Sequence, residues 1–450
     1  MKKFLIRLFL PALALGLFAA SPAAAVDAES VYIFNSLLFL IGGFLVMWMA
    51  AGFAMLEAGL VRTKNVGDIC LKNILLYALA CIAFYAVGYN LMYNGVDGGF
   101  LGNFTTFGAV DTAALAEDGA SYDSGYAAGS DFFFQMVFVA TAASIVSGTV
   151  AERVKLFPFL GFTLILSAII YPIEGAWHWG AGFLHAEAFV AFAGAEFLDF
   201  AGSTTVHATG GWAALMGAII LGPRLGRYGK NGAVRPMPGS NMPMATLGTF
   251  ILWLGWFGFN GASQLAMGSA ADVVSISNIF VNTNMAAAGG CVVAALMTKA
   301  LYKKVDITMV LNGALAGLVS ITAEPLTPTI GQAILIGGFG AVLVTFAVPL
   351  FDKFKIDDVV GALSVHLVCG IWGTIAVVFT NSDATLVAQL SGIAIVGAFV
   401  SLASAMAWYA LKLTVGIRLS EEEEHIGSDV AELGMEAYPE FGRGSQKLGL

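Results

Sequence analysis

The chain has 450 residues, of which 58% are hydrophobic and only 11% are charged, and its mean hydropathy is +0.83. This composition excludes a soluble globular protein, and the long apolar runs with 54 glycines indicate packed transmembrane helices rather than a membrane β-barrel. The net charge of −9 owes much to an acidic tail after Leu419, and it gives no sign of a nucleic-acid surface.

The first 25 residues have the three parts of a secretory signal. Basic Lys2, Lys3 and Arg7 precede an apolar stretch at 8–20, and small residues then offer a cleavage site after Ala25. The apolar stretch is shorter than the roughly 20 residues of a spanning helix, which favours cleavage over an uncleaved first span. We expect a signal peptide (1–25), a transmembrane domain (26–418) and a cytoplasmic tail (419–450).

Eleven further segments are apolar and long enough to cross a bilayer, and the eighth is the shortest. They lie at 31–58, 67–93, 131–151, 155–176, 200–222, 243–264, 276–301, 307–323, 329–351, 358–380 and 386–415. The predicted fold class is therefore an all-α polytopic membrane protein with eleven transmembrane helices.

The basic residues predict the orientation of these segments. Removing the three basic residues of the signal from the 21 of the chain leaves 18, and all of them fall on one side if the mature N-terminus is outside. The charged residues in the loops on the other side are all acidic. By the positive-inside rule, the mature N-terminus lies outside and the C-terminus lies on the cytoplasmic side.

Two of the segments contain the same histidine pattern. Asp199 stands eight residues before His207, Asp358 stands eight residues before His366, and each histidine lies in a Val-His-x-x-x-Gly sequence. Eight helical residues advance about 12 Å, close to half of a core about 30 Å thick, and the two segments enter from opposite sides. Both histidines then approach the midplane, and the first ten helices form a 5+5 inverted repeat with one extra helix, a common transporter design.

Each of these ionisable groups also has a structural interpretation. A buried histidine is often a hydrogen-bonded core residue, but two at matching depth favour a pair that shares a hydrogen between ring nitrogens. Either aspartate can cap a helix N-terminus. Asp199, at the outer mouth, also favours an approaching cation, whereas we expect Asp358 to be only a cap.

Aromatic residues gather at the outer ends of three predicted helices, in 132–138, 177–180 and 255–263. They could form no more than an interfacial belt. Their convergence with Ser263 and Asp199 instead suggests a vestibule that binds a cation through ring faces and hydrogen bonds.

Several longer motifs together resemble a known family. They are 54–62 (AMLEAGLVR), 148–153 (GTVAER), 199–207 (DFAGSTTVH), 255–260 (GWFGFN) and 365–370 (VHLVCG). In order and in spacing, over about residues 31–440, they resemble the bacterial Amt type within the Amt/Mep/Rh superfamily of ammonium transporters. Two outer stretches, 94–130 and 185–198, are longer than in compact members of that family.

The resemblance implies a homotrimer with one pore in each subunit and assigns roles to matching residues. The implied roles are an outer ammonium site (Trp179, Phe138, Ser263, with Asp199 shaping it), a stacked phenyl gate (Phe138, Phe259), a twin-histidine pair (His207, His366) and a further pore-lining residue (Trp256). Thr322 fits the family pattern less closely. The tail from Glu421 resembles the family's inner tail, which contacts neighbouring subunits and PII regulatory proteins.

The expected activity is transport of ammonium, and of methylammonium if the site accepts it, within the lipid bilayer. Ammonium binds outside, loses its proton at the gate, and crosses as ammonia past His207 and His366, while the proton crosses separately and moves net charge. The four cysteines lack a C-x-x-C spacing, and we expect no cofactor, no metal and no enzymatic reaction.

Two other classes of function use the same residues. A membrane redox protein could bind haem between His207 and His366, although a flanking aromatic mouth argues against it. A receptor could use the pocket to sense ammonium and signal through the tail, and we expect sensing to be secondary at most.

Overall fold

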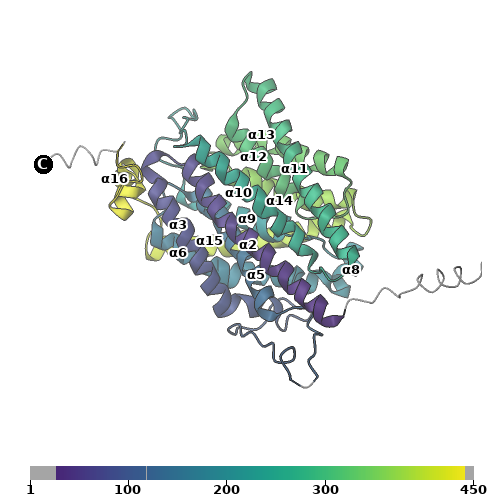
Figure 1. Cartoon of the computed structure of the whole chain (residues 1–450). Coiled ribbons are helices and arrows are strands. Elements are labelled where there is room, and N and C mark those ends of the chain that lie inside the picture. The colour runs from purple at the N-terminus through teal and green to yellow at the C-terminus, as the bar shows by residue number, and fades with distance from the viewer. Residues whose placement is uncertain (1–26, 118, 441–450) are drawn as a thin grey trace, which may run out of the picture.

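The computed structural model describes residues 27–117 and 119–440 (Figure 1), so the predicted signal peptide lies outside the described residues. The described residues form helices and loops, with two isolated β-bridges and no longer strand. Figure 1 shows long tilted helices side by side, the loop that follows α4 at one end, and α16 at the other end. The all-α polytopic fold is confirmed.

The first five predicted segments correspond to helices that three short π-helical stretches interrupt or begin. The bounds are α2 (Ala28–Leu60), α3 (Val66–Ala83) continued by η2 (Phe84–Gly88) and α4 (Tyr89–Tyr93), α5 (Ala128–Val150), α6 (Leu156–Ile165) continued by η3 (Leu166–Ile170) and α7 (Tyr171–His178), and η5 (Ser203–Ala208) continued by α9 (Thr209–Leu221). Between α7 and η5 lie two short helices, η4 (Phe183–His185) and α8 (Glu187–Ala193).

The remaining segments follow the same order. The bounds are α10 (Met242–Gly261) with η6 (Ala262–Gln264), α11 (Ala270–Tyr302), α12 (Ile307–Ile321), α13 (Ile330–Lys353), η7 (Leu363–Val368) continued by α14 (Cys369–Ala376) and η8 (Val377–Phe379), and α15 (Leu386–Thr414). A short η1 (Thr63–Asn65) precedes α3, and the tail forms α16 (Glu421–Ile426) and η9 (Asp429–Leu433). Within the described residues, nine helices are long and apolar enough to cross a membrane. Ile307–Ile321 and Leu363–Phe379 are apolar but shorter, so eleven crossings remain a prediction.

Helices α2 and α11 begin directly after their capping residues, several positions before the start that the apolar pattern predicts. Asp27 accepts a hydrogen bond from the backbone N–H of Ser30 at 2.8 Å and begins α2. Ser269 and Asp272 form a reciprocal capping box, so α11 begins at Ala270 rather than at the predicted residue 276. The first turn of such a helix is polar, and hydropathy therefore places its start too late.

Glycines let the first helices of the two halves, α2 and α10, pack closely along their length. A Cβ on Gly248 would lie 2.3 Å from the backbone nitrogen of Leu56, and one on Gly59 would lie 2.5 Å from that of Ala245. In the same way, a Cβ on Gly290 of α11 would lie 2.0 Å from the Gly313 carbonyl of α12. Without a hydrophobic effect between helices in lipid, such close backbone approach supplies the van der Waals contact that holds them together.

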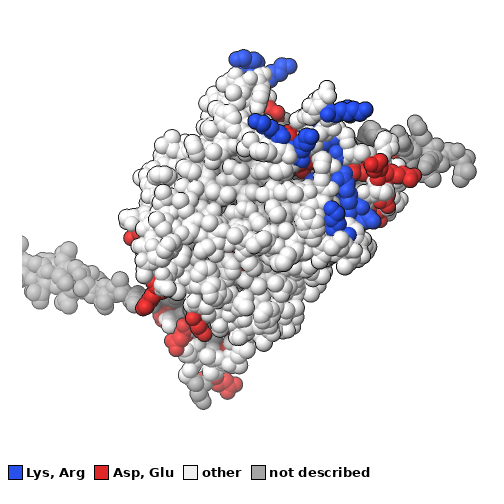
Figure 2. All heavy atoms as spheres, turned by 180° about the vertical axis from the view of Figure 1, so that it is seen from behind, with Lys and Arg blue, Asp and Glu red and all other residues white. Residues whose placement is uncertain are grey.

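The charged residues separate toward the two ends of the bundle. On the face seen in Figure 2, lysine and arginine gather at the end that carries the C-terminal tail, and the opposite end carries only acidic groups. At the basic end, a buried network joins loops that are distant in sequence: Glu152 pairs with Arg62 at 2.5 Å and with Arg224 at 3.2 Å, and Arg224 also pairs with Asp357 at 2.8 Å. Two of the family-like motifs, 54–62 and 148–153, therefore meet in this scaffold.

Candidate functional site

His207 and His366 are in direct contact at the centre of the bundle. Their Nδ1 atoms are 3.2 Å apart, the ring centroids are 5.2 Å apart, and both side chains are almost completely buried. The two residues come from the π-helical stretches η5 and η7. The structure thus brings together the two histidines that the sequence places at matching depth.

The two aspartates each cap the histidine segment that follows. Asp199 Oδ2 accepts from the backbone N–H groups of Thr204 at 3.0 Å and Thr205 at 2.8 Å. Asp358 accepts from those of Ala362 at 3.1 Å and Leu363 at 2.8 Å. Both predicted caps are confirmed.

A glycine with positive φ completes each cap. Gly202 (φ 103°) and Gly361 (φ 85°) stand three residues after the aspartates, in a backbone region that L side chains rarely adopt. The shared pattern is therefore Asp-x-x-Gly-x-x-x-x-His, and the repeated glycine is visible in the sequence, although only the Asp-to-His spacing guided the prediction.

The glycine after each histidine packs against the opposite segment. A Cβ on Gly211 would lie 2.6 Å from the Leu367 Cβ, beside His366, and one on Gly370 would lie 2.4 Å from the Ser203 carbonyl oxygen, at the start of the His207 segment. The two segments thus cross at two reciprocal glycines. This crossing explains why Val-His-x-x-x-Gly occurs twice.

Aromatic rings form a column that ends at the histidine pair. Trp179 meets Phe138 edge-on with centroids 5.9 Å apart, and Phe138 lies against Phe259 at 4.2 Å. Phe259 then stacks on His207 at 5.2 Å, and Trp256 covers the same imidazole at 4.9 Å. Phe138, Phe259 and Trp256 are buried, whereas Trp179 is partly exposed.

Hydrogen bonds fix the rings of this column. The indole N–H of Trp256 donates to Thr322 Oγ1 at 2.8 Å, and that of Trp179 donates to the Asp199 carbonyl oxygen at 3.1 Å. Ser263, one helical turn beyond Phe259, donates to the Phe259 carbonyl oxygen at 2.8 Å, and its partly exposed hydroxyl can still accept a hydrogen bond. Thr322, the least secure match in the sequence, is thus tied directly to the column.

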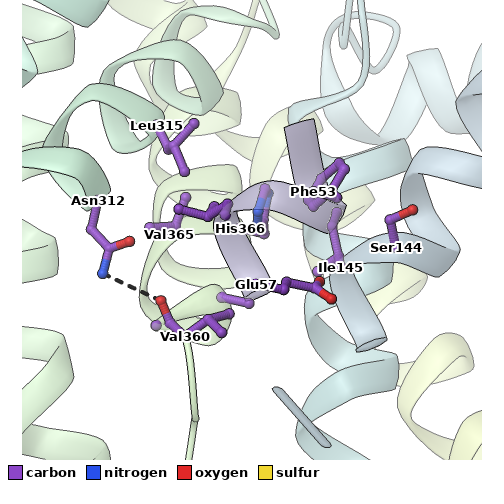
Figure 3. Close-up of a pocket in the computed structure, with 12 residues that line it drawn as sticks. Phe53, Glu57, Ser144, Ile145, Asn312, Leu315, Val360, Val365 and His366 are labelled. Carbon is purple, nitrogen blue, oxygen red and sulfur yellow. Dashed lines mark hydrogen bonds between the residues drawn. The ribbon is translucent and has the colours of Figure 1, made fainter. Parts of the chain in front are cut away.

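A pocket lies against His366 (Figure 3). Its walls come from α2, α5, α12 and the segment 360–366, and they include Phe53, Glu57, Ser144 and Asn312. Glu57 is buried, and its two carboxylate oxygens accept from Ser147 Oγ and Asn73 Nδ2, both at 2.7 Å. In the sequence, Glu57 stands out only as part of the motif at 54–62. An acidic residue in a long apolar helix is itself a signal for a pore or cavity.

The geometry of the histidine pair limits its chemistry. Two imidazoles joined through their Nδ1 atoms share one hydrogen, so one ring presents Nε2–H and the other presents an Nε2 lone pair. His207 Nε2 is buried and has no hydrogen-bond partner among the described residues. The pair can therefore donate to and accept from a small polar molecule. A haem does not fit between the rings, because their direct contact leaves no room for iron and its macrocycle.

Comparisons with known proteins agree with this architecture. The sequence profile of the Ammonium Transporter Family matches residues 37–438. The chain is 42% identical to the ammonium transporter Amt2 of Archaeoglobus fulgidus over 89% of this chain and 87% of the relative, and 36% identical to Amt1 of Haloferax mediterranei over 90% and 80%. A solved structure named Sensor Amt Protein superposes with a TM-score of 0.81 at 35% identity, covering 90% of this chain and 99% of that one. Candida albicans Mep2 superposes with a TM-score of 0.75 at 27% identity, covering 92% and 93%.

Proposed function

The chain belongs to the ammonium transporter family, and from this premise we propose that it takes up ammonium through the column of rings that ends at His207 and His366. One observation carries the proposal: Trp179, Phe138, Phe259, His207 and His366 follow one another in successive ring contacts. This order leads from a partly exposed tryptophan to a fully buried pair of imidazoles.

Recruitment occurs at the outer end of the column. The ring faces of Trp179 and Phe138 attract ammonium, and Ser263 offers a hydroxyl oxygen as acceptor. Asp199 is buried behind Trp179, and its field favours a cation at this mouth. The same chemistry admits methylammonium, since one methyl group leaves the charge in place.

The phenyl pair separates the ion from the inner path. Phe138 and Phe259 are buried and apolar, so an intact ammonium ion would lose its hydration there without compensation, at a cost of many kcal/mol, whereas neutral ammonia loses far less. Ammonium therefore gives up its proton at the gate. Ammonia passes His207 and His366, the proton crosses separately with their help, and net charge enters the cell.

Electrical recording on proteoliposomes tests this mechanism. We expect ammonium to evoke an inward current, potassium to evoke none, and a His207→Ala, His366→Ala double variant to lose transport. Absence of an ammonium-evoked current in the unmodified protein would reject electrogenic uptake. Unchanged transport in the double variant would reject the role of the histidines.

We also propose the topology and assembly that the family pattern implies. The basic end faces the bacterial cytoplasm, the mature N-terminus is periplasmic, and three subunits assemble in the inner membrane, each with its own pore. Charge separation between the two ends supports this orientation. Labelling of an epitope in the tail from the periplasmic side of intact cells would contradict it, and the mass of the protein in nanodiscs measures the number of subunits.

The tail is proposed to bind a PII-type regulator at the cytoplasmic face. In the described part of the tail, Arg418 pairs with Glu424 at 2.8 Å, and Asp429 accepts from the backbone N–H of Asp68 at 2.8 Å. The tail is thus held against the inner loops beneath the pore. Pull-down of a purified PII protein by full-length but not tail-truncated protein is the expected result.

Sensing is the second candidate, and the name of one structural relative, Sensor Amt Protein, favours it. Growth on limiting ammonium separates the two functions in cells that lack other ammonium transporters. A transporter restores growth, whereas a sensor without transport does not.

A further inference from the structure

The outer mouth contains two histidines that the transport mechanism does not use. His178, directly before Trp179, and His185 lie with their rings parallel and their centroids 4.8 Å apart. His178 Nδ1 is 2.7 Å from His185 Nε2, and His185 Nδ1 is 2.7 Å from Glu196 Oε2. At the other end, His178 Nε2 is 3.3 Å from the Asp199 carbonyl oxygen, which also accepts from Trp179.

The hydrogen bonds that link Glu196, the two histidines and the Asp199 carbonyl oxygen need more N–H hydrogens than two neutral imidazoles supply. Three hydrogen bonds run between two end groups, a backbone carbonyl and a carboxylate, that can only accept. Each of the three bonds needs one N–H hydrogen, but two neutral imidazoles carry only two. The Glu196 side chain is 51% exposed, so its oxygens also face water, and we assign the third hydrogen to the imidazole pair.

We propose that His178 and His185 form a proton-binding site that holds one extra proton and positions Asp199 and Trp179. With this proton the pair carries one positive charge, and all three hydrogen bonds form. The proton site needs only the chain's own residues, and the link to ammonium binding rests on the function proposed above. Within the described part of the chain, no group of three or more His, Cys, Asp or Glu side chains is arranged to hold a metal ion.

Burial disfavours a charge on the His178 ring, so the positive charge of the pair belongs on His185, which is partly exposed and bonded to the Glu196 carboxylate. The packed elements are α4, the loop that follows it, α7, α8, α15 and the segment before η5. Their titratable groups near the pair are Tyr93, Asp97, Tyr171, Glu174, Glu187 and Asp199, besides Glu196 itself. None of these groups is a base, so none adds a second positive charge beside the pair, and the buried Tyr93, Tyr171 and Glu174 are neutral. α15 contributes the neutral Gln389, which binds the backbone of Leu198.

Loss of the extra proton breaks a specific bond. The bond from His185 to the Glu196 carboxylate is charge-assisted and is the strongest of the three, so it is retained. His185 Nε2 then accepts from His178 Nδ1, which leaves the His178 Nε2 lone pair facing the Asp199 carbonyl oxygen. Two acceptors repel each other. Deprotonation therefore loosens the carbonyl that holds Trp179, and ammonium binding weakens as the pH rises.

Glu196→Gln tests the hydrogen count with little change in shape. The glutamine amide can donate to His185 Nδ1, and all three hydrogen bonds then form with two neutral imidazoles. The matched control is Glu187→Gln, which removes an exposed carboxylate from α8 in the same outer region and leaves the three hydrogen bonds unchanged.

The direct measurement is histidine NMR on ¹⁵N-histidine-labelled full-length protein in nanodiscs, because the chain has only five histidines. Between about pH 5 and 8, we expect His178 and His185 to bind one proton together in a single step. Glu196→Gln should lower the midpoint of this step by about one pH unit or more, since it removes a hydrogen bond to a charged group. Glu187→Gln should leave the midpoint unchanged. A pair that stays neutral throughout, or a midpoint that Glu196→Gln does not move, would overturn the proton site.

The apparent KM for ammonium then tests the link to the outer site. In the unmodified protein, we expect KM to rise about twofold to tenfold between about pH 6 and pH 8 at constant maximal rate. This fold-change corresponds to the loss of one hydrogen bond. In Glu196→Gln the KM should stay flat. Equal pH profiles in the two proteins would overturn the positioning role. Absence of transport in the unmodified protein would reject the proposed function instead, and NMR would still decide the proton site.

Discussion

The two histidine segments share one local design and differ in what surrounds it. Each aspartate accepts two backbone N–H groups and one threonine hydroxyl: Asp199 binds Thr205 Oγ1 at 2.9 Å, and Asp358 binds Thr149 Oγ1 at 3.1 Å. The outer cap is thus completed by its own segment, whereas the inner cap is completed by α5. Beside the inner cap lies a buried network of arginines and carboxylates, and beside the outer cap lie tryptophan, histidine and acidic groups. We therefore expect the same motif to serve the proposed binding site at one end and to anchor the fold at the other.

The largest effect should come from breaking the buried ion pair between Asp357 and Arg224, which we call the inner anchor. Asp357 accepts three hydrogen bonds from Arg224, through the backbone N–H at 2.8 Å and the guanidinium at 2.8 and 2.9 Å. Asp357→Asn should destabilise the protein by about 3–5 kcal/mol, because the buried Arg224 loses its main partner. The apparent melting temperature in detergent measures this loss. Asp352→Asn removes the partly exposed partner of Arg227 and should cost only about 0–1 kcal/mol. Equal losses in the two variants would contradict the anchoring role.

The inner anchor should also tolerate mild acid. Burial would raise the pKa of Asp357, but hydrogen bonds and charge from Arg224 and the charge of Arg153 outweigh burial and hold this pKa below its usual range. A lowered folded pKa means that the stabilisation is present above the pKa of an unfolded aspartate and is lost only as pH falls through the lower folded value. The difference in melting temperature between the unmodified protein and Asp357→Asn should therefore persist at pH values just below neutrality.

The crossing of the two segments should be the next most sensitive feature. Gly370→Ala places a Cβ 2.4 Å from the Ser203 carbonyl oxygen and should cost about 1–3 kcal/mol or more, since backbone must move. The same melting measurement applies. Gly331→Ala in α13 is the control, because nothing lies within 4 Å of its added Cβ. A Gly370→Ala protein as stable as this control would show that the segments can separate freely.

Asparagine should distinguish the two aspartates. At Asp358 both oxygens accept backbone N–H groups, so an amide NH₂ must face a donor, and Asp358→Asn should cost about 1–2 kcal/mol. At Asp199 one oxygen accepts all three bonds and the other has no partner, so Asp199→Asn can keep the cap while it removes the charge. We expect Asp199→Asn to melt normally and to lose several-fold in ammonium uptake. A loss of stability in Asp199→Asn together with a loss of uptake but not of stability in Asp358→Asn would contradict these roles.

The threonine hydroxyls should give the smallest effects. Thr205→Val and Thr149→Val each remove one hydrogen bond to an aspartate and should lower stability by about 0.5–1.5 kcal/mol. Thr163→Val, whose hydroxyl bonds only the Phe159 carbonyl of its own helix, provides the baseline. If Thr149→Val matched this baseline while Thr205→Val did not, the inner cap would not depend on α5.

Several parts of the fold could be read from local sequence. Apolar length predicted the helices, because every backbone group in a bilayer must be satisfied within its own segment. The matched spacing from aspartate to histidine predicted that His207 and His366 would meet, and they do. The assumed rise of 1.5 Å per residue was wrong, because the histidines lie in π-helical stretches that begin at Ser203 and Leu363, after non-helical turns. Motif resemblance named the rings of the column, and the structure brings Trp179, Phe138, Phe259 and Trp256 together around His207. Their roles in transport remain predictions.

Other features depend on contacts between residues far apart in the chain. Thr149 reaches Asp358 across 209 positions, and Arg62 reaches Glu152 across 90, and no periodicity or spacing links either pair. Glu57 becomes part of a pocket only because α5, α12 and the segment before His366 pack around it. The His178, His185 and Glu196 chain spans the lengthened outer stretch, where turns rather than hydropathy set the path.

The sequence by itself determined which segments are helices, which end is basic, and which two histidines form a matched pair, because these follow from length, charge and spacing along a single segment. The tertiary structure decided which side chains share a hydrogen bond, which carboxylates are neutralised, and where the two glycine crossings fall. Those outcomes depend on how helices pack, and packing is set by many contacts between distant parts of the chain at once.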